Sequence, residues 1–337
     1  MARKWRIRFV GARYHVTSRG NGREKIFYAD EDRERFLDQL SAGLAADNVI
    51  LYAYCLMPNH FHLLVETPWG NIQRFMHRLN TAYSMYFRYK NARPGHCFET
   101  RYQAKLAGGD DYLVRLTRYI HLNPVKVKAL ERAGIEEKRR RLEGYRWSSY
   151  QGYAGLGPEE DIVDYRWLAL MGRRTSRGNR QTYKRYVEGF LGAEDAKLKE
   201  ALEASGYAVG DAAFREEMED GLKGARLRKG CTGDIVWPKG KPVGVEVVER
   251  GVAKAFGVKV ADLHFHGHRQ GRVKAVAVEL CCQLTERTQR EIATHFGYTS
   301  ESSVGKQRKR LAVLVREDAD LSAKMQALKR HLLDSTI

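Results

Sequence analysis

The chain has 337 residues, and 59 Lys and Arg against 41 Asp and Glu give it a formal charge of +18. This length allows a substantial core and predicts two domains. The positive charge predicts a polyanionic partner, with nucleic acid as the first candidate and an anionic membrane surface as the rival. We see no signal peptide and no run that could span a bilayer, and the five cysteines are an odd number without paired spacing. We therefore expect a cytoplasmic protein with reduced thiols and no membrane segment.

The first 155 residues predict a sheet with packed helices. Alternating polar and apolar residues indicate strands, and apolar residues at helical spacing indicate helices. Pro124 ends the last of these helices, because the residue before a proline disfavours the helical conformation. In chain order we expect a strand over 5–18, a helix from 30 to about 44, strands over 49–55 and 60–66, a helix over 71–89, a strand over 98–106 and a helix over 111–123.

Two histidines stand two positions apart in the apolar stretch 54–66. His60 and His62 are followed by Leu63, Leu64 and Val65, which reads as a buried strand. On a strand, residues i and i+2 point to the same face, so both imidazoles would project side by side. Neutral imidazole is a common metal ligand, and the pair therefore predicts a metal site on a sheet. The alternative is a pair of hydrogen-bonded histidines at a strand end.

The helix at 111–123 carries Tyr119 and Asn123 one turn apart, on the same face. The alternatives are an aromatic residue in the helix–sheet interface and a helix C-cap before proline. Arg118 adds a cation where a phosphate would need one. Further cations that we expect to contact DNA lie in the turn after the first strand and along the fourth strand: Arg19, Arg101 and Lys105.

Residues 156–242 are polar and helical in tendency, and they predict a connector to which we assign no chemistry. From 243 to 333 the pattern changes to short amphipathic helices. Two of these, 287–295 and 302–317, are joined by a short glycine-containing turn, which predicts a helix-turn-helix.

His264 and His266 repeat the spacing of the first histidine pair. They fall in a predicted basic loop without an acidic or thiol partner. We interpret them as loop residues, not as metal ligands.

Two motifs together, Leu56-Met-Pro-Asn-His60-Phe-His62 and Arg118-Tyr119-Ile-His-Leu-Asn123-Pro124, resemble the single-tyrosine HUH transposases. The REP-associated tyrosine transposase branch is the closer match. The resemblance covers about residues 5–155 and implies an α+β, ferredoxin-like βαββαβα domain with an antiparallel sheet and helices on one side. It also implies that His60 and His62 bind Mg²⁺ or Mn²⁺, that Tyr119 is the nucleophile and that Asn123 is a third ligand.

The activity implied by this resemblance is nicking and joining of single-stranded hairpin DNA through a 5′-phosphotyrosine. A phenol with a pKa of about 10 is a poor nucleophile at neutral pH, so a divalent cation on the phosphate would help. The REP-associated branch favours a monomer over a dimer. If Tyr119 were not the nucleophile, Tyr112 would be the next candidate. The alternative function is a non-catalytic DNA-binding regulator.

Residues 243–333 resemble the DNA-binding domain IV of the initiator DnaA, through the stretch 291–297 and the serine pair 302–303. The resemblance implies an all-α domain that binds duplex DNA, and hence a nucleoid-associated protein. It does not imply recognition of an initiator-type box, because Thr299 and Glu301 replace the base-reading groups. The alternative is a helical interaction module. The residues that we expect at duplex DNA are Arg269, Arg272, Lys274, Ser302, Ser303, Lys306 and Arg308.

Overall fold

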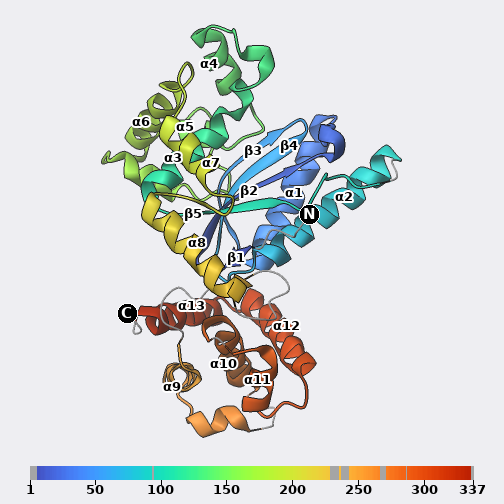
Figure 1. The fold of residues 1–337 in the computed structure, drawn as a ribbon, viewed down its shortest axis with the longest axis vertical. Helices are drawn as coiled ribbons and strands as arrows, with labels where there is room; N and C mark the ends of the chain where they lie inside the picture. The colour runs from blue at the N-terminus through green and yellow to red at the C-terminus, as the bar shows by residue number, and fades with distance from the viewer. Residues whose placement is uncertain are drawn as a thin grey trace. The chain divides into compact units, whose positions relative to one another are not determined.

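The computed structural model describes residues 6–92, 95–227, 235–236, 243–265, 271–285 and 287–334. The chain forms two compact units, Met1–Ile235 and Val236–Ile337. Figure 1 shows the first unit in blue to yellow and the second in orange to red. Within the described ranges, no helix is both long enough and apolar enough to cross a membrane.

A five-stranded sheet organises the first unit, with the strand order β3-β4-β2-β5-β6. Strands β2 to β5 pair in antiparallel fashion, whereas β6 runs parallel to β5. The predicted order of elements is confirmed from β2 to α3, and the fold class is α+β. The strands are β1 (Ile7–Arg8), β2 (Ala12–Arg19), β3 (Ile50–Met57), β4 (His60–Thr67), β5 (Gln103–Ala107), β6 (Ala208–Val209) and, at the boundary of the units, β7 (Ile235–Val236).

The helices of the first unit form two groups along the chain. Among the described residues, five of them lie within the predicted domain, residues 1–155, and three follow it along the chain. They are α1 (Asp30–Asp47), α2 (Ile72–Asn91), α3 (Asp110–Leu122), α4 (Ile135–Glu143), α5 (Tyr150–Ala154), α6 (Ser176–Glu188), α7 (Ala196–Ala204) and α8 (Ala212–Leu227), with 3-10 turns η1 (Asn21–Arg23), η2 (Asn123–Val125), η3 (Lys128–Leu130) and η4 (Arg166–Met171).

Helices cover both faces of the sheet (Figure 1). Phe36 of α1 packs on Phe61 of β4 with 4.8 Å between ring centroids, and Tyr83 of α2 lies 5.2 Å from Phe36. The next residue of β4, His62, points to the opposite face, where its ring lies 5.8 Å from that of Tyr119 on α3. The family resemblance implied helices on one side of the sheet only, and this prediction is wrong. Neighbouring residues of β4 contact α1 on one face and α3 on the other.

Residues 156–227, predicted as part of a connector, pack into the first unit. The backbone N–H of Leu106 on β5 donates to the carbonyl of Tyr207, 2.8 Å away, next to the strand β6. Phe214 of α8 lies over Gly108, where a Cβ atom would approach the ring to 2.5 Å. Only glycine leaves room for this ring, so the packing of α8 depends on that position.

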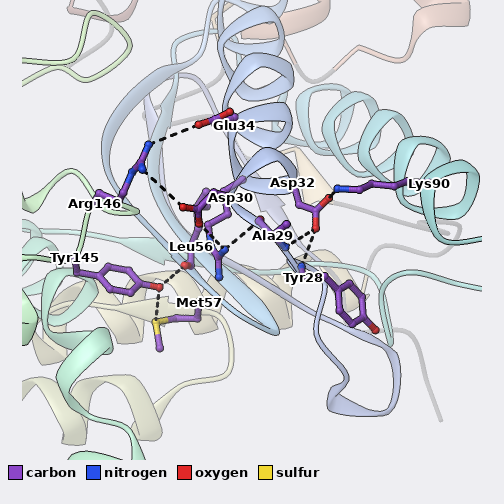
Figure 2. A network of polar contacts seen from close by, with 11 residues as sticks. Tyr28, Ala29, Asp30, Asp32, Glu34, Leu56, Met57, Lys90, Tyr145 and Arg146 are labelled. Atoms are coloured by element: carbon purple, nitrogen blue, oxygen red, sulfur yellow. Dashed lines mark hydrogen bonds and ion pairs between the residues drawn. The ribbon is translucent and has the colours of Figure 1, made fainter.

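A polar network joins the start of α1 to the end of β3 and to the segment after α4 (Figure 2). The guanidinium of Arg146 lies 3.7 Å from Asp30 and 3.6 Å from Glu34. The hydroxyl of Tyr145 donates to the carbonyl of Leu56 at 2.6 Å. The ion pairs are exposed and contribute little, so the tyrosine bond is the stronger attachment of this segment to the sheet.

The carboxylate of Asp32 fixes the first turn of α1 (Figure 2). It accepts hydrogen bonds from the backbone N–H groups of Tyr28 at 2.8 Å and Ala29 at 3.0 Å, and Lys90 of α2 lies 2.6 Å away. A helix start leaves its first N–H groups without helical partners. Asp32 satisfies two N–H groups there and joins α1 to α2.

The second unit is all-helical in its described part. Helix α10 is its core, with Val276, Val278 and Leu280 fully buried, and it packs against α9, α11, α12 and α13. The two helices predicted to form a helix-turn-helix are α11 and α12. The elements are α9 (Val245–Phe256), η5 (Val260–His264), α10 (Gly271–Leu284), α11 (Gln289–His295), α12 (Glu301–Glu317) and α13 (Ala319–Asp334).

Candidate active site

The candidate site lies on the face of the sheet that α3 covers. In the β2–β4 register, Thr17 is opposite His62 and Arg19 is opposite His60. Residues directly opposite each other on paired strands point to the same face, and alternate residues of one strand share a face. His15, two positions before Thr17, therefore belongs to the same row of side chains.

A cavity of about 330 Å³ opens above this row. It is lined by residues of β2, β4, β5 and α3, by residues 99–101 before β5 and by Leu202 of α7. Residues predicted from the sequence that line it are Arg19, His60, His62, Arg101, Lys105 and Tyr119. The alternative nucleophile, Tyr112, is not among the lining residues.

Hydrogen bonds orient the histidine rings. Nδ1 of His60 lies 2.7 Å from Oδ1 of Asn59, so this nitrogen donates and Nε2 carries the lone pair. Nδ1 of His62 lies 3.0 Å from Nε2 of His15, and the two rings stack with 5.3 Å between centroids. When His62 donates to His15, its Nε2 is also available as an acceptor. The rings of His60 and His62 are 5.0 Å apart and nearly perpendicular.

All three imidazoles are held neutral. Burial lowers the pKa of His15 to about 4, with a further contribution from Lys105. Burial, then Arg19, lowers the pKa of His60 to about 4. Burial, followed by the two neighbouring histidines and Arg19, lowers the pKa of His62 well below its usual value. A histidine binds a metal only in its neutral form, so the site presents its imidazoles in the ligand form at neutral pH.

Tyr119 points its ring edge-on to two of these histidines. The centroid distances are 5.7 Å to His15 and 5.8 Å to His62. Burial raises the pKa of the phenol, and the charge of Arg19 acts in the opposite direction. The phenol is therefore protonated at neutral pH, and any attack by its oxygen requires stabilisation of the developing charge.

Asn123 follows the end of α3, and its amide is used locally. Nδ2 donates to the carbonyls of Tyr119 at 3.0 Å and Ile120 at 3.2 Å. The side chain is not part of the cavity lining. In the part of the chain that the structure describes, nothing bonds to its Oδ1, so this oxygen keeps free lone pairs.

The structure places Arg118 away from the cavity. Its side chain is 2% exposed and forms an ion pair with Asp195. The guanidinium lies 3.5 Å from the ring centre of Phe190 and 4.3 Å from that of Tyr186. The predicted DNA contact is therefore corrected, because a buried and paired guanidinium cannot reach a phosphate. Arg118 instead joins α3 to the segment between α6 and α7.

Lys105 lines the cavity, but its ammonium group also holds the end of α7. It donates to the backbone carbonyls of Leu202 and, at 3.0 Å, Ser205. Carbonyl groups at a helix C-terminus lack helical partners and carry partial negative charge. Lys105 thus fixes one wall of the cavity in addition to contributing positive charge.

The predicted duplex-binding residues of the second unit divide into paired and exposed ones. Arg272 pairs with Asp318, and Arg308 lies 2.6 Å from Glu279. Lys274 is buried, with its ammonium 4.8 Å from the ring centre of Tyr298. These three cations have structural contacts that the sequence did not indicate.

Three of the remaining four predicted residues lie on α12. Lys306 and Ser302 are exposed on α12, and Ser303 is half-buried beside Ser302. The hydroxyls of both serines contact Ser300, at 2.8 and 3.1 Å. Arg269 lies outside the described residues.

The sequence analysis missed two titratable residues that line the cavity, Glu99 and His15. His15 is the one in contact with His62. It lies within a run recognised only as a strand, and its contact with His62 depends on the pairing of β2 with β4. The available signal was the alternation His15-Val-Thr17-Ser-Arg19, which places three polar side chains on one face.

Comparison with known proteins adds further evidence on the function of the first unit. Residues 9–123 match the family model described as Transposase IS200 like. This stretch contains both histidines and the tyrosine. The match supports a transposase role for the first unit and confirms the resemblance seen in the sequence.

Curated relatives match in the C-terminal region and are chromosomal replication initiator proteins DnaA. The protein of Geobacter sulfurreducens is 31% identical over 102 residues, and that of Geobacter metallireducens is 30% identical over 103 residues. Each match covers 30% of this chain and 23% of the relative. The chain therefore spans about a quarter of the length of these relatives.

Among solved structures, the chain is similar to a REP-associated tyrosine transposase bound to a REP hairpin. The TM-score is 0.38 and the sequence identity is 14%. The match covers 49% of this chain and 94% of the other.

Proposed function

We propose that the first unit nicks and rejoins single-stranded DNA at hairpin-forming repeats, through a covalent 5′-phosphotyrosine at Tyr119. The observation that carries the proposal is the convergence of Tyr119, two neutral histidines and Arg19 on one cavity. The family match over residues 9–123 supports the same reaction class. A positively charged cavity suits a phosphodiester, and the tyrosine supplies the nucleophile.

The residues present fit a divalent cation. His60 and His62 offer neutral imidazoles from one rigid strand and line the cavity. Asn123 lies outside the cavity lining, and its amide would have to turn from its local hydrogen bonds to supply the third ligand. We assign these three residues as its ligands. Mn²⁺ suits imidazole better than Mg²⁺, which prefers oxygen ligands. When bound, such a cation polarises the phosphate and offsets its developing charge.

The proposed step conserves the bond count at phosphorus. The oxygen of Tyr119 forms a bond to phosphorus, and the bond from phosphorus to the 3′-oxygen breaks. The phenol loses one proton and the 3′-oxygen gains one, so no net proton is released. A 3′-hydroxyl can attack the phosphotyrosine in reverse, which allows strand transfer as well as cleavage.

Arg19, Arg101 and Lys105 line the same cavity as Tyr119. We assign these cations to the binding of single-stranded hairpin DNA. For the second unit we propose binding of duplex DNA, supported by its similarity to DnaA and by the exposed Lys306 of α12. Such a protein would act as a monomer in the cytoplasm, at the nucleoid.

The decisive experiment uses a hairpin oligonucleotide labelled at its 3′ end, with and without Mn²⁺, run on a denaturing protein gel. Wild-type protein should form a labelled adduct only with Mn²⁺. Tyr119→Phe should form none while still binding the hairpin, and Tyr112→Phe should behave as wild type. An adduct that persists in Tyr119→Phe and disappears in Tyr112→Phe would show that Tyr112 is the nucleophile and that the assignment to Tyr119 is wrong.

The second candidate function is a non-catalytic DNA-binding regulator. The similarity of the C-terminal region to DnaA favours it. A regulator would bind duplex DNA with sequence preference and form no adduct with any hairpin at any Mn²⁺ concentration. The same gel therefore separates the two functions.

A further inference from the structure

Three potential metal ligands converge in the second unit, apart from the candidate active site. They are Glu249 of α9, His264 of η5 and His295 at the end of α11. The prediction that His264 lies in a loop without an acidic partner is therefore wrong, because Glu249 approaches it from another helix. One ligand atom from each lies within 4.8 Å of the others. Across the described ranges, no other set of three His, Cys, Asp or Glu side chains meets this criterion.

The geometry of the cluster is that of two imidazoles directed at one oxygen. Nε2 of His264 lies 2.8 Å from Oε1 of Glu249, and Nε2 of His295 lies 2.9 Å from the same oxygen. The side chain of Glu249 is 6% exposed, whereas both imidazoles are about one-third exposed. A carboxylate at the base and two histidines at the mouth leave an ion a route from solvent.

Packing holds the two rings in place. The ring of His264 stacks on Phe296 with 5.4 Å between centroids and 12° between planes. The ring of His295 meets Phe296 edge-on at 5.1 Å, and Phe296 is fully buried. The ligand atoms are thus positioned by a core aromatic residue.

We propose that Glu249, His264 and His295 form a binding site for a divalent transition metal of the zinc class. Two imidazole nitrogens and one carboxylate oxygen match the ligand types that Zn²⁺ takes in proteins. Ligand bonds of about 2.0–2.2 Å around a tetrahedral ion would separate the ligand atoms by roughly 3.3–3.5 Å. Each imidazole would therefore retreat from the carboxylate by about half an ångström.

The same contacts also suit a purely hydrogen-bonded cluster, in which each Nε2 carries a proton and donates to Glu249. The two states compete for the same nitrogen atoms, because a metal replaces those protons. The buried carboxylate favours a cation, since a buried charge requires compensation. The metal would join α9, η5 and α11, and so stabilise the first helix of the predicted helix-turn-helix.

Cobalt binding provides the test, because tetrahedral Co²⁺ is coloured and occupies zinc sites. The 337-residue chain is prepared with His60→Ala and His62→Ala, which removes the other histidine pair. One equivalent of Co²⁺ should produce a saturable visible absorption that Zn²⁺ abolishes, and Zn²⁺ should raise the melting temperature. This result does not depend on DNA cleavage, so it is separate from the proposed function.

Two variants in that background localise the site. Glu249→Gln keeps the shape and one hydrogen-bond acceptor but removes the charge, and His264→Ala removes one ligand. Each should weaken Co²⁺ binding at least 10-fold with unchanged helical circular dichroism, whereas His77→Ala, an exposed position on α2, should have no effect. Absence of a saturable one-equivalent signal, or a signal that survives both variants, would overturn the proposal.

Discussion

The spacing His-x-His occurs at His60 and His62 and again in the stretch His264-Phe-His266-Gly-His268, and these two places in the chain have different structural settings. His60 and His62 stand on a central strand, so the spacing itself places both rings on one face. His264 ends a short 3-10 turn, and its partners come from two other helices, while His266 lies outside the described residues. The same two-residue spacing is therefore informative on a strand and uninformative in a loop, where tertiary contacts choose the partners.

The largest expected effect comes from removing the strand-borne pair. His60→Ala with His62→Ala should lower Mn²⁺-dependent adduct formation by roughly 10³-fold or more, about 4 kcal/mol of barrier. Duplex binding by the second unit should not change, as measured by fluorescence anisotropy on a duplex probe. Equal loss in the control His77→Ala would show that the effect is not specific to the site.

Acidification should have the next largest effect, a loss of folding stability that arises from His15. His15 is neutral in the folded state because its pKa is lowered to about 4, whereas the unfolded value is about 6.5. The unfolded state binds more protons below that value, so the stabilising effect is complete above about pH 6.5 and is lost as the pH falls towards 4. The expected loss for His15 is roughly 3 kcal/mol.

Urea unfolding of wild type and His15→Gln at pH 7 and pH 4.5 measures that loss. The variant should lose less stability on acidification than wild type, and the difference isolates this histidine from other acid-sensitive groups. Equal losses in the two proteins would refute the argument.

A smaller effect is expected for His15 as the residue that orients His62. His15→Phe keeps the stacked ring and removes the hydrogen bond. Apparent Mn²⁺ affinity in the adduct assay should fall about 10–100-fold, as for other residues that hold a metal ligand. Higher Mn²⁺ should restore the rate; a loss that no Mn²⁺ concentration restores would indicate a catalytic role instead.

The smallest effect is expected for Asn123. Asn123→Ala should reduce adduct formation about 10-fold, about 1.4 kcal/mol, if its oxygen is the third ligand. Asn123→Asp should recover activity at low Mn²⁺, because a carboxylate is the stronger ligand. An alanine variant with wild-type activity would reduce Asn123 to a helix-end residue.

The sequence predicted the part of the site that local periodicity determines. Alternation on a strand placed His60 beside His62. Helical spacing related Tyr119 only to Asn123, and its place beside the histidines was implied by the resemblance to the single-tyrosine HUH transposases. His15 could not be assigned to the site from the sequence. It lies 47 residues before His62, and its contact with that residue depends on how β2 and β4 pair.

Arg118 shows why a charged residue next to a candidate nucleophile is a weak signal. Adjacent helical residues point about 100° apart, so Arg118 and Tyr119 cannot share a face. The arginine instead meets Asp195, 77 residues later in the chain, and nothing in the local pattern indicates that partner.

The second cluster did leave a trace in the sequence. The buried stripe of α9 consists of Val245, Val248, Glu249, Val252 and Ala253. A carboxylate at an apolar position of an amphipathic helix requires a partner. The partners of Glu249 could not be identified from the sequence, because only the packing of the unit brings His264 and His295 to this carboxylate.

The attachment of β6 to β5 has a practical consequence for dividing the chain. A fragment ending at residue 155 would expose β5 as an edge strand, with the N–H groups of Leu106 and Gly108 released from Tyr207 and Val209. Open edges invite pairing between molecules and aggregation. The same cut would remove Leu202 from the cavity wall. The smallest useful piece of the first unit therefore extends to the end of α8, at Leu227.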